Sequence, residues 1–250
     1  MRFAYRRGHA HFDGFEFAPL KIKDVSRRDT FTLEEYDELV RYLRTYASKA
    51  QCADETTRLE RLLIRDCILI ASNTMLRVGE LWQLRWGDVL SYEQRADDAG
   101  RVVLLVTLKV RGETAKTRRS RVITTRGGEY FKRLYERTTY REKSDLVFCT
   151  EAGDKRLRKR TLYGAWDELM QGIGLDYKTR NVTWYSLRHF GITCRLRAGA
   201  SIFDISKIAG NSVSDIERNY GHFDQDMAIA AALKNFRVRA DGLEEVKVER

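Results

Sequence analysis

The segment from Tyr185 to Tyr220, YSLRHFGITCRLRAGASIFDISKIAGNSVSDIERNY, constrains the fold of this chain more than any other. Apolar residues recur at helical spacing along it, which predicts a helix headed by Arg188 and His189 and a second helix that ends before Asn211. Tyr220 follows Asn211 by nine residues. Each of these polar side chains can bond a phosphate oxygen or attack one, so the segment predicts a phosphate site built on packed helices.

Composition favours a folded chain with a polyanionic partner. The 250 residues can bury a substantial core and correspond to one large domain or two small ones. Hydrophobic residues make up 43% of the chain and aromatic residues 11%, which argues against disorder. Lysine and arginine total 46 against 36 aspartate and glutamate, and the net charge of +10 favours phosphate-rich partners, because such contacts release counterions.

The sequence carries no membrane, secretory or metal-binding signal. No apolar run approaches the ~20 residues of a membrane span, and the N-terminal residues lack the apolar core of a secretory signal. The cysteines form no CxxC pair, so reduced, mostly buried thiols are expected rather than disulfides or a zinc site. We therefore expect a cytoplasmic protein without a metal or a cofactor. The four cysteines are Cys52, Cys67, Cys149 and Cys194.

Hydrophobic periodicity predicts a mainly α fold with one small antiparallel β-sheet, an α+β class. The first long helix is predicted to begin after Thr32, which forms a capping box with Glu35. The apolar helix predicted at Asp226–Phe236 is expected to pack on a neighbouring protomer, because its alanine and leucine face would otherwise be exposed to water. The other predicted helices are Thr57–Asn73, a short one after Arg77, Glu129–Thr138, Leu162–Ile173 and this last one, Asp226–Phe236; the predicted strands are Arg101–Val110 and Arg118–Thr125.

Four segments, in order along the chain, resemble the catalytic domain of the tyrosine recombinases, the phage-integrase family. NTMLRVGELWQLRWGDV resembles the first arginine box of that family, AKTRRSRVI its lysine hairpin, YSLRHFGIT its second arginine box and IAGNSVSDIERNYGH its tyrosine box. The resemblance covers residues 30–236 and implies the recombinase catalytic-domain fold. It implies catalytic roles for Arg77, Lys116, Arg188 and Tyr220, with Asn211 in the position nine residues before the nucleophile.

Two positions depart from the family pattern. Tyr185 stands where the family usually has histidine, and Asn211 where it usually has histidine or tryptophan. A phenol has a pKa near 10 and is protonated at neutral pH, so we expect Tyr185 to donate a hydrogen bond to a phosphate oxygen. The proton of Tyr220 is then expected to pass to water or to the phosphate. His189 is expected to orient a backbone or phosphate contact.

The residue types suit the chemistry that the resemblance implies. A phosphodiester attacked by tyrosine gains negative charge on its non-bridging oxygens, and the guanidiniums of Arg77 and Arg188 present charged planar forks to them. Lys116 can protonate the leaving 5′-oxygen, and Tyr220 can hold the DNA as a 3′-phosphotyrosine. Glu80 is expected to be a carboxylate partner of an active-site group.

Other basic residues of the predicted hairpin are expected to follow DNA phosphates. Lys109 also lies in the hairpin and is an alternative to Lys116 as the catalytic lysine. The residues expected to bind the DNA backbone are Arg118, Arg119 and Arg121.

The resemblance also implies an organisation and partners. Residues 1–30 are expected to be the end of a truncated core-binding domain with a linker, residues 31–237 the catalytic domain and residues 238–250 a charged tail. The expected partner is double-stranded DNA, bound by a homo-tetramer on two sites, with a monomer in the absence of DNA. A phage or mobile-element integrase associated with a bacterial nucleoid is expected. The alternatives are a type IB topoisomerase-like enzyme and a catalytically silent DNA-binding relative.

Overall fold

The computed structural model describes residues 2–9, 11, 29–97, 99–150, 157–220, 235–239 and 242–246. Within this range the chain is mainly helical with a small three-stranded antiparallel sheet, as predicted. The helices are α1 (Arg2–Arg6), α2 (Leu33–Tyr46), α3 (Glu55–Thr74), α4 (Val78–Leu81), α5 (Gly128–Arg137), α6 (Lys159–Gly172), α7 (Trp184–Arg197), α8 (Ile202–Ala209) and α9 (Val213–Tyr220). The strands are β1 (Val89–Ala96), β2 (Val102–Val110), β3 (Arg121–Arg126), β4 (Asn235–Arg239) and β5 (Gly242–Val246).

Local sequence signals set the starts of the first long helices. The predicted capping box is confirmed, since Glu35 N donates to Thr32 Oγ1 at 3.2 Å and Thr32 N donates to the Glu35 carboxylate at 2.8 Å. Helix α3 begins two residues before the predicted start because Asp54 caps it, accepting from Thr57 N at 2.6 Å. Arg180 then ties the start of α2 to the segment before α7 through ion pairs with Asp29 and Glu35.

The sheet has the order β1-β2-β3, and the sequence predicted only its last two strands. Strand β1 was missed because nearly all of its side chains are exposed to some degree, so it shows no alternation of apolar and polar residues. Strand β3 begins at Arg121 rather than Arg118, because the preceding residues form the turn that joins it to β2. Buried positions of β2 and β3 face each other in the register, as with Leu108 opposite Ile123.

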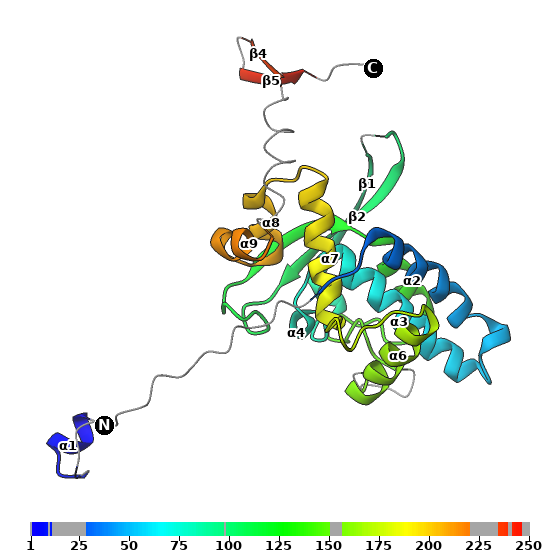
Figure 1. The fold of residues 1–250 in the computed structure, drawn as a ribbon, viewed down its shortest axis with the longest axis horizontal. Helices are drawn as coiled ribbons and strands as arrows, with labels where there is room; N and C mark the ends of the chain where they lie inside the picture. The colour runs from blue at the N-terminus through cyan, green and yellow to red at the C-terminus, as the bar shows by residue number, and fades with distance from the viewer. Residues whose placement is uncertain are drawn as a thin grey trace.

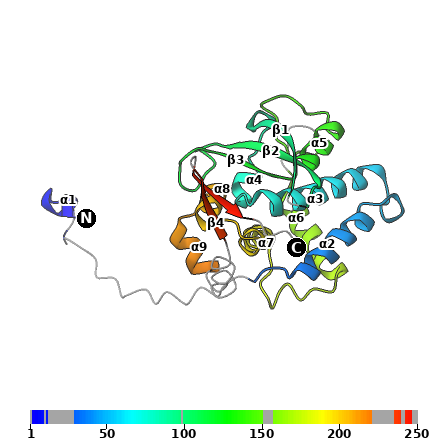
Figure 2. The same ribbon diagram turned by 90° about the horizontal axis from the view of Figure 1, so that it is seen from above.

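Helix α7 lies between two hydrophobic cores. The main core unites α2, α3, α5, α6 and the sheet, and α7 contributes Leu187 and Phe190 to it. The smaller core joins α7 to α8 and α9, and α7 contributes Ile192 and Leu196. In Figure 2 the sheet lies along one side of the molecule, α3 runs through the middle and α2 lies opposite. Helices α8 and α9 lie together on one side of α7 in both views (Figures 1 and 2). Helix α8 also contacts β3, so the last helices lie against the sheet.

A glycine allows α7 to approach the end of α3 closely. A Cβ added at Gly191 would overlap the carbonyl oxygen of Ser72 and lie 3.0 Å from Cγ of Met75. The Ser72 hydroxyl is also hydrogen-bonded to the Tyr36 hydroxyl at 2.5 Å, which joins α2 to the same turn of α3. The absence of a side chain at Gly191 therefore sets the distance between α3 and the helix that carries Arg188 and His189.

We predict that Gly191→Ala lowers the free energy of unfolding by about 1–3 kcal/mol, the usual cost of overpacking, because the methyl group meets backbone rather than a flexible side chain. Gly164→Ala in α6 is the matched control, since a Cβ there meets nothing within 4 Å. The control should gain about 0.5–1 kcal/mol through the higher helix propensity of alanine. Urea denaturation followed by circular dichroism measures both, and equal stability of the two variants would contradict the close approach.

The C-terminal segment contains two strands that the sequence did not predict. Strands β4 and β5 pair antiparallel, with Arg237 opposite Glu244 and Val238 opposite Leu243. They lie across the predicted start of a charged tail at residue 238, where apolar residues alternate with charged ones, a pattern typical of strands. The predicted helix Asp226–Phe236 lies outside the described residues, apart from its last two positions, which begin β4.

Candidate active site

Three guanidinium groups converge on the C-terminal end of α8. Gly210 ends this helix in the left-handed conformation, with φ of 68°, and the last carbonyls are left without partners inside the helix. These carbonyls carry the negative end of the helix dipole, so they favour cationic donors. The bonds join Arg121 Nε to the Ile208 oxygen at 3.1 Å, Arg188 Nη2 to the Ala209 oxygen at 2.8 Å and Arg77 Nη2 to the Gly210 oxygen at 2.5 Å.

Arg188 is one of the largest fully buried side chains among the described residues. Its guanidinium also donates to the carbonyl of Met75 and to the side-chain oxygen of Asn211. Burial, and after it the charge of Arg77, lowers the pKa of Arg188 to about 10, so the group stays protonated at neutral pH. These bonded acceptors are neutral, so they hold the guanidinium in place without cancelling its charge. The predicted second arginine and Asn211 are therefore in direct contact.

The Glu80 carboxylate bridges the other two arginines. Its oxygens accept from Arg121 Nη1 at 3.0 Å and Nη2 at 2.8 Å, and from Arg77 Nη1 at 3.2 Å and Arg77 N at 3.0 Å. Burial opposes ionisation of Glu80, but the hydrogen bonds and charges of Arg121 and then of Arg77 outweigh it, so the pKa of Glu80 lies below its ordinary value. Glu80 is thus the carboxylate partner that the sequence predicted for Arg77.

The structure does not place Arg121 where the sequence predicted it. It was expected to follow DNA phosphates, but its guanidinium bonds Glu80 and the end of α8, and its side chain is largely buried. The reason is its place at the first position of β3, beside which α8 packs. Arg118 and Arg119, by contrast, are exposed on the turn between β2 and β3.

Tyr220 is buried in the smaller core, and its hydroxyl is hydrogen-bonded to Nδ1 of His189. The two rings lie 5.4 Å apart between centroids. Tyr185, one helical turn before His189 on α7, packs edge-to-face on the imidazole with centroids 4.8 Å apart. The predicted nucleophile, the residue in the family's histidine position and His189 thus form one cluster. The sequence placed His189 near Arg188 but did not predict its contact with Tyr220, because the residues are 31 positions apart.

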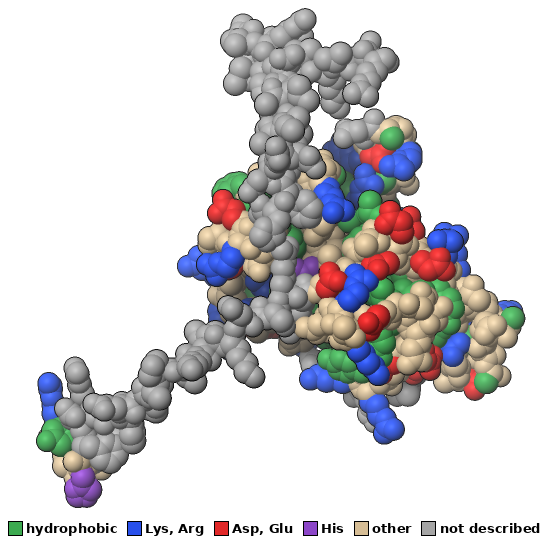
Figure 3. Space-filling model, in the orientation of Figure 1, with side chains coloured by type: hydrophobic (Ala, Val, Ile, Leu, Met, Phe, Trp, Pro, Cys, Tyr) green, Lys and Arg blue, Asp and Glu red, His purple; other side chains and the backbone are tan. Residues whose placement is uncertain are grey.

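Lys116 lies on the exposed turn between β2 and β3 with Arg118 and Arg119. Its charge adds to the lowering of the pKa of Asp215 on α9, which the Ser212 hydroxyl chiefly causes. The arginines, Glu80, Asn211 and the tyrosine–histidine cluster are therefore brought together by the fold, whereas Lys116 is on a neighbouring exposed segment. On the face shown in Figure 3, Lys and Arg side chains are interspersed with Asp and Glu rather than gathered in one patch.

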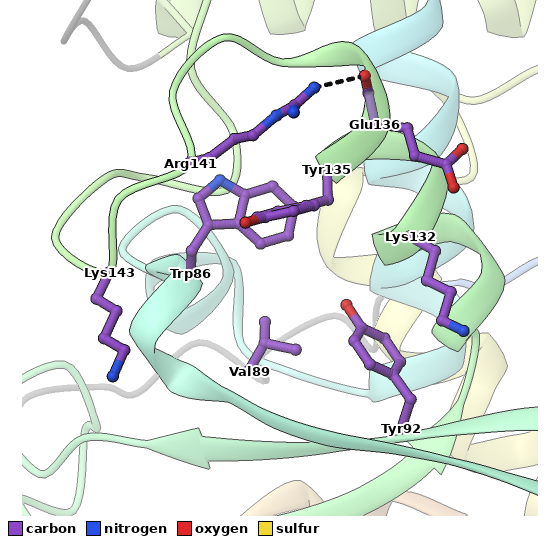
Figure 4. Close-up of a pocket in the computed structure, with 8 residues that line it drawn as sticks. All are labelled: Trp86, Val89, Tyr92, Lys132, Tyr135, Glu136, Arg141 and Lys143. Atoms are coloured by element: carbon purple, nitrogen blue, oxygen red, sulfur yellow. Dashed lines mark hydrogen bonds between the residues drawn. The ribbon is translucent and has the colours of Figure 1, made fainter.

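A cavity of about 390 Å³ lies away from these residues, between the start of β1, α5 and the loop after it. Its walls combine aromatic and charged side chains, and Trp86 packs edge-to-face on Tyr135 with centroids 5.0 Å apart (Figure 4). None of the residues predicted to be catalytic lines it. The lining residues are Trp86, Val89, Tyr92, Lys132, Tyr135, Glu136, Arg141 and Lys143. Among the described residues, no group of three His, Cys, Asp or Glu is placed to hold a metal ion, and no helix is long and apolar enough to span a membrane.

The sequence profile of the Phage integrase family matches residues 29–227. This chain belongs to that family. The match includes both arginines, the lysine hairpin and the tyrosine segment, and it confirms the resemblance drawn from the four boxes. No sequence among curated proteins matches the chain.

Solved structures of site-specific recombinases share the fold. XerH recombinase bound to difH substrate aligns with a TM-score of 0.59 at 18% identity, over 92% of this chain and 61% of that one. The Tn1549 transposon integrase in complex with a circular intermediate DNA has a TM-score of 0.59 at 15% identity, over 92% and 74%. A lambda integrase dimer bound to a core site has a TM-score of 0.52 at 16% identity, over 88% and 70%. The present chain thus spans about three fifths of the length of the XerH recombinase that it matches.

We predict that Glu80→Gln destabilises this phage-integrase family member on the order of 3 kcal/mol at pH 7, because it removes the charge that compensates two partly buried arginines. The Glu80 carboxyl has a lowered pKa in the folded chain, so its contribution is present above its ordinary value of 4.5 and is lost as the pH falls through the folded-state value. The difference between variant and wild type should therefore stay constant from pH 7 down to about pH 5 and shrink only as the pH falls below 4.5, measured by urea denaturation.

Glu38→Gln is the control for this measurement. Glu38 pairs with Arg41 at 2.6 Å on the exposed face of α2, where an ion pair contributes only about 0–1 kcal/mol. A Glu80 variant as stable as the Glu38 variant at pH 7 would contradict the proposed charge compensation.

Proposed function

We propose that this chain carries the catalytic centre of a DNA strand-cleaving and rejoining recombinase, an integrase of a phage or another mobile element. Tyr220 attacks a DNA phosphodiester to form a 3′-phosphotyrosine and a free 5′-hydroxyl, and the reverse reaction joins a new 5′-hydroxyl. The observation that carries this proposal is the network in which Arg188 bonds Asn211 and shares the end of α8 with Arg77, next to the buried Tyr220.

The arginines stabilise the charge that develops on the phosphate. Arg188, bonded to neutral oxygens, keeps its positive charge available for the non-bridging oxygens of the five-coordinate state. Arg77 adds to it, because it shares the single charge of Glu80 with Arg121. Because the side-chain oxygen of Asn211 accepts from Arg188, its NH₂ group is the donor offered to a phosphate oxygen. Tyr185, which lies on the same face of α7 as Arg188, supplies a further neutral donor. The exposed Arg118 and Arg119 follow the DNA backbone beside the scissile phosphate.

The partner in this proposal is double-stranded DNA, which the solved recombinase structures named above hold in their complexes. Four protomers on two DNA sites carry out strand exchange, and the chain is monomeric without DNA. A type IB topoisomerase-like activity differs in needing one protomer and one DNA site. Relaxation of a supercoiled plasmid without strand exchange between two sites would therefore favour that alternative.

We predict that the wild-type protein forms a denaturant-resistant adduct with DNA through Tyr220. The cleavage site can be found by covalent capture, in which nicked duplexes of randomised sequence are incubated with the protein, denatured, and sequenced from the protein-bound fraction. Tyr220→Phe should give no adduct while still shifting DNA in a gel, because only the attacking oxygen is lost. Tyr163→Phe, at an exposed position of α6, should give the wild-type yield. An adduct that persists in Tyr220→Phe would overturn the assignment.

We predict that Lys116 is the general acid for the leaving 5′-oxygen. Lys116→Ala should slow single-turnover cleavage by about 10²–10⁴-fold on an ordinary phosphodiester. The loss should nearly disappear on a substrate with sulfur at the bridging 5′ position, because a thiolate leaves without a proton. Lys109→Ala, at an exposed position of β2 in the same hairpin, is the matched control and should cleave both substrates at the wild-type rate. If Lys109→Ala instead slowed cleavage of the ordinary phosphodiester and Lys116→Ala did not, Lys109 would be the general acid in place of Lys116.

A further inference from the structure

The hydroxyl of Tyr220 is hydrogen-bonded to the imidazole of His189. This contact joins α7 to α9 across 31 residues of sequence. Tyr220 is 6% exposed and His189 is half-buried, so the bond lies at the edge of the smaller core rather than on an open surface. The contact therefore holds the nucleophile in one orientation before DNA is bound.

The bond joins the Tyr220 hydroxyl to Nδ1 of His189, and the imidazole tautomer sets its direction. In the neutral tautomer with its hydrogen on Nε2, Nδ1 carries a lone pair, so the phenol donates and the imidazole accepts. A nucleophile hydroxyl that donates to an imidazole nitrogen is the arrangement by which enzymes activate weak oxygen nucleophiles. Tyr185 packs edge-to-face on the same imidazole and fixes the plane of its ring.

A positive charge lies close to the phenols of this cluster. The phenol groups of Tyr220 and Tyr185 both interact electrostatically with Arg188, and Arg77 lies next to it with its partner Glu80. An arginine charge beside a phenol stabilises the phenolate. The groups in contact with the imidazole include the phenol of Tyr185 on α7 and the phenol of Tyr220 on α9.

We propose that His189 is the proton acceptor for Tyr220 in DNA cleavage and the proton donor to it in rejoining; this inference rests on the proposed function. The O–H bond of Tyr220 breaks and its proton passes to His189 Nδ1, while the Tyr220 oxygen forms a bond to phosphorus. The bond from phosphorus to the 5′-oxygen breaks, and Lys116 protonates that oxygen. The role belongs to a residue one position after Arg188, because the family's histidine position holds a phenol in this chain.

Rescue by an external base tests this role with the full chain and a captured nicked duplex. His189→Ala should slow single-turnover formation of the Tyr220 adduct by about 10²–10⁴-fold, the usual contribution of a general base. Added imidazole should restore the rate in proportion to its concentration, and more basic methylimidazoles should restore it further. The wild type should not respond to imidazole.

Tyr185→Ala is the matched control, because it also removes an aromatic ring from this cluster but leaves the base His189 in place. The cleavage rate of Tyr185→Ala should be the same with and without added imidazole. His189→Gln, which keeps a polar side chain of similar size, checks that the loss is not one of folding: its far-ultraviolet circular dichroism and DNA shift should match the wild type while cleavage is slow.

Two outcomes would overturn the inference: a wild-type cleavage rate in His189→Gln, or a slow His189→Ala whose rate does not depend on imidazole. Both leave the adduct of the wild-type protein intact. Absence of an adduct in the wild type on every captured duplex would instead contradict the proposed function, so the two failures are distinguishable.

Discussion

The end of α8 is the constraint on which the site depends. Its last carbonyls need donors, and its dipole favours cations, so three arginines from separate elements meet there. Arg77 precedes α4, Arg121 begins β3 and Arg188 lies on α7. The carbonyls that orient these guanidiniums carry no net charge. Glu80 supplies one negative charge against the three positive ones. The site therefore stays positive, which is the property needed to bind a phosphate.

Carboxylates are used sparingly around this positive site. Glu80 balances Arg121 and part of the charge of Arg77, and it leaves Arg188 bonded to neutral oxygens. Asp66, a buried carboxylate on α3, is instead paired with arginines of α3 and α5, where it stabilises a helix contact. The same pairing of one buried acid with several arginines thus appears in two places.

Helix α7 couples the packing of the molecule to the chemistry of the site. It is apolar on two faces because it separates the main core from the smaller one, and Gly191 lets it lie against the α3 backbone. Arg188, His189 and Tyr185 are therefore held on a helix that packs on both sides. Helix α9 contributes only Ile216 and Tyr220 to the smaller core among the described residues, so the nucleophile is attached by far fewer apolar contacts than the residues it meets.

The sequence alone determined the family, the mainly α class with its hairpin, and the residue types of the site, because each depends on local order: a capping box at Thr32, apolar periodicity, and boxes of fixed spacing. It missed β1, whose exposed residues show no alternation of apolar and polar side chains. It predicted that Arg121 binds DNA, because the sequence around a basic hairpin residue does not reveal whether its partner is a phosphate or Glu80. The contact of His189 with Tyr220 came only from the tertiary structure. Hydrogen bonds between residues far apart in sequence are set by how helices pack, and no local pattern records them.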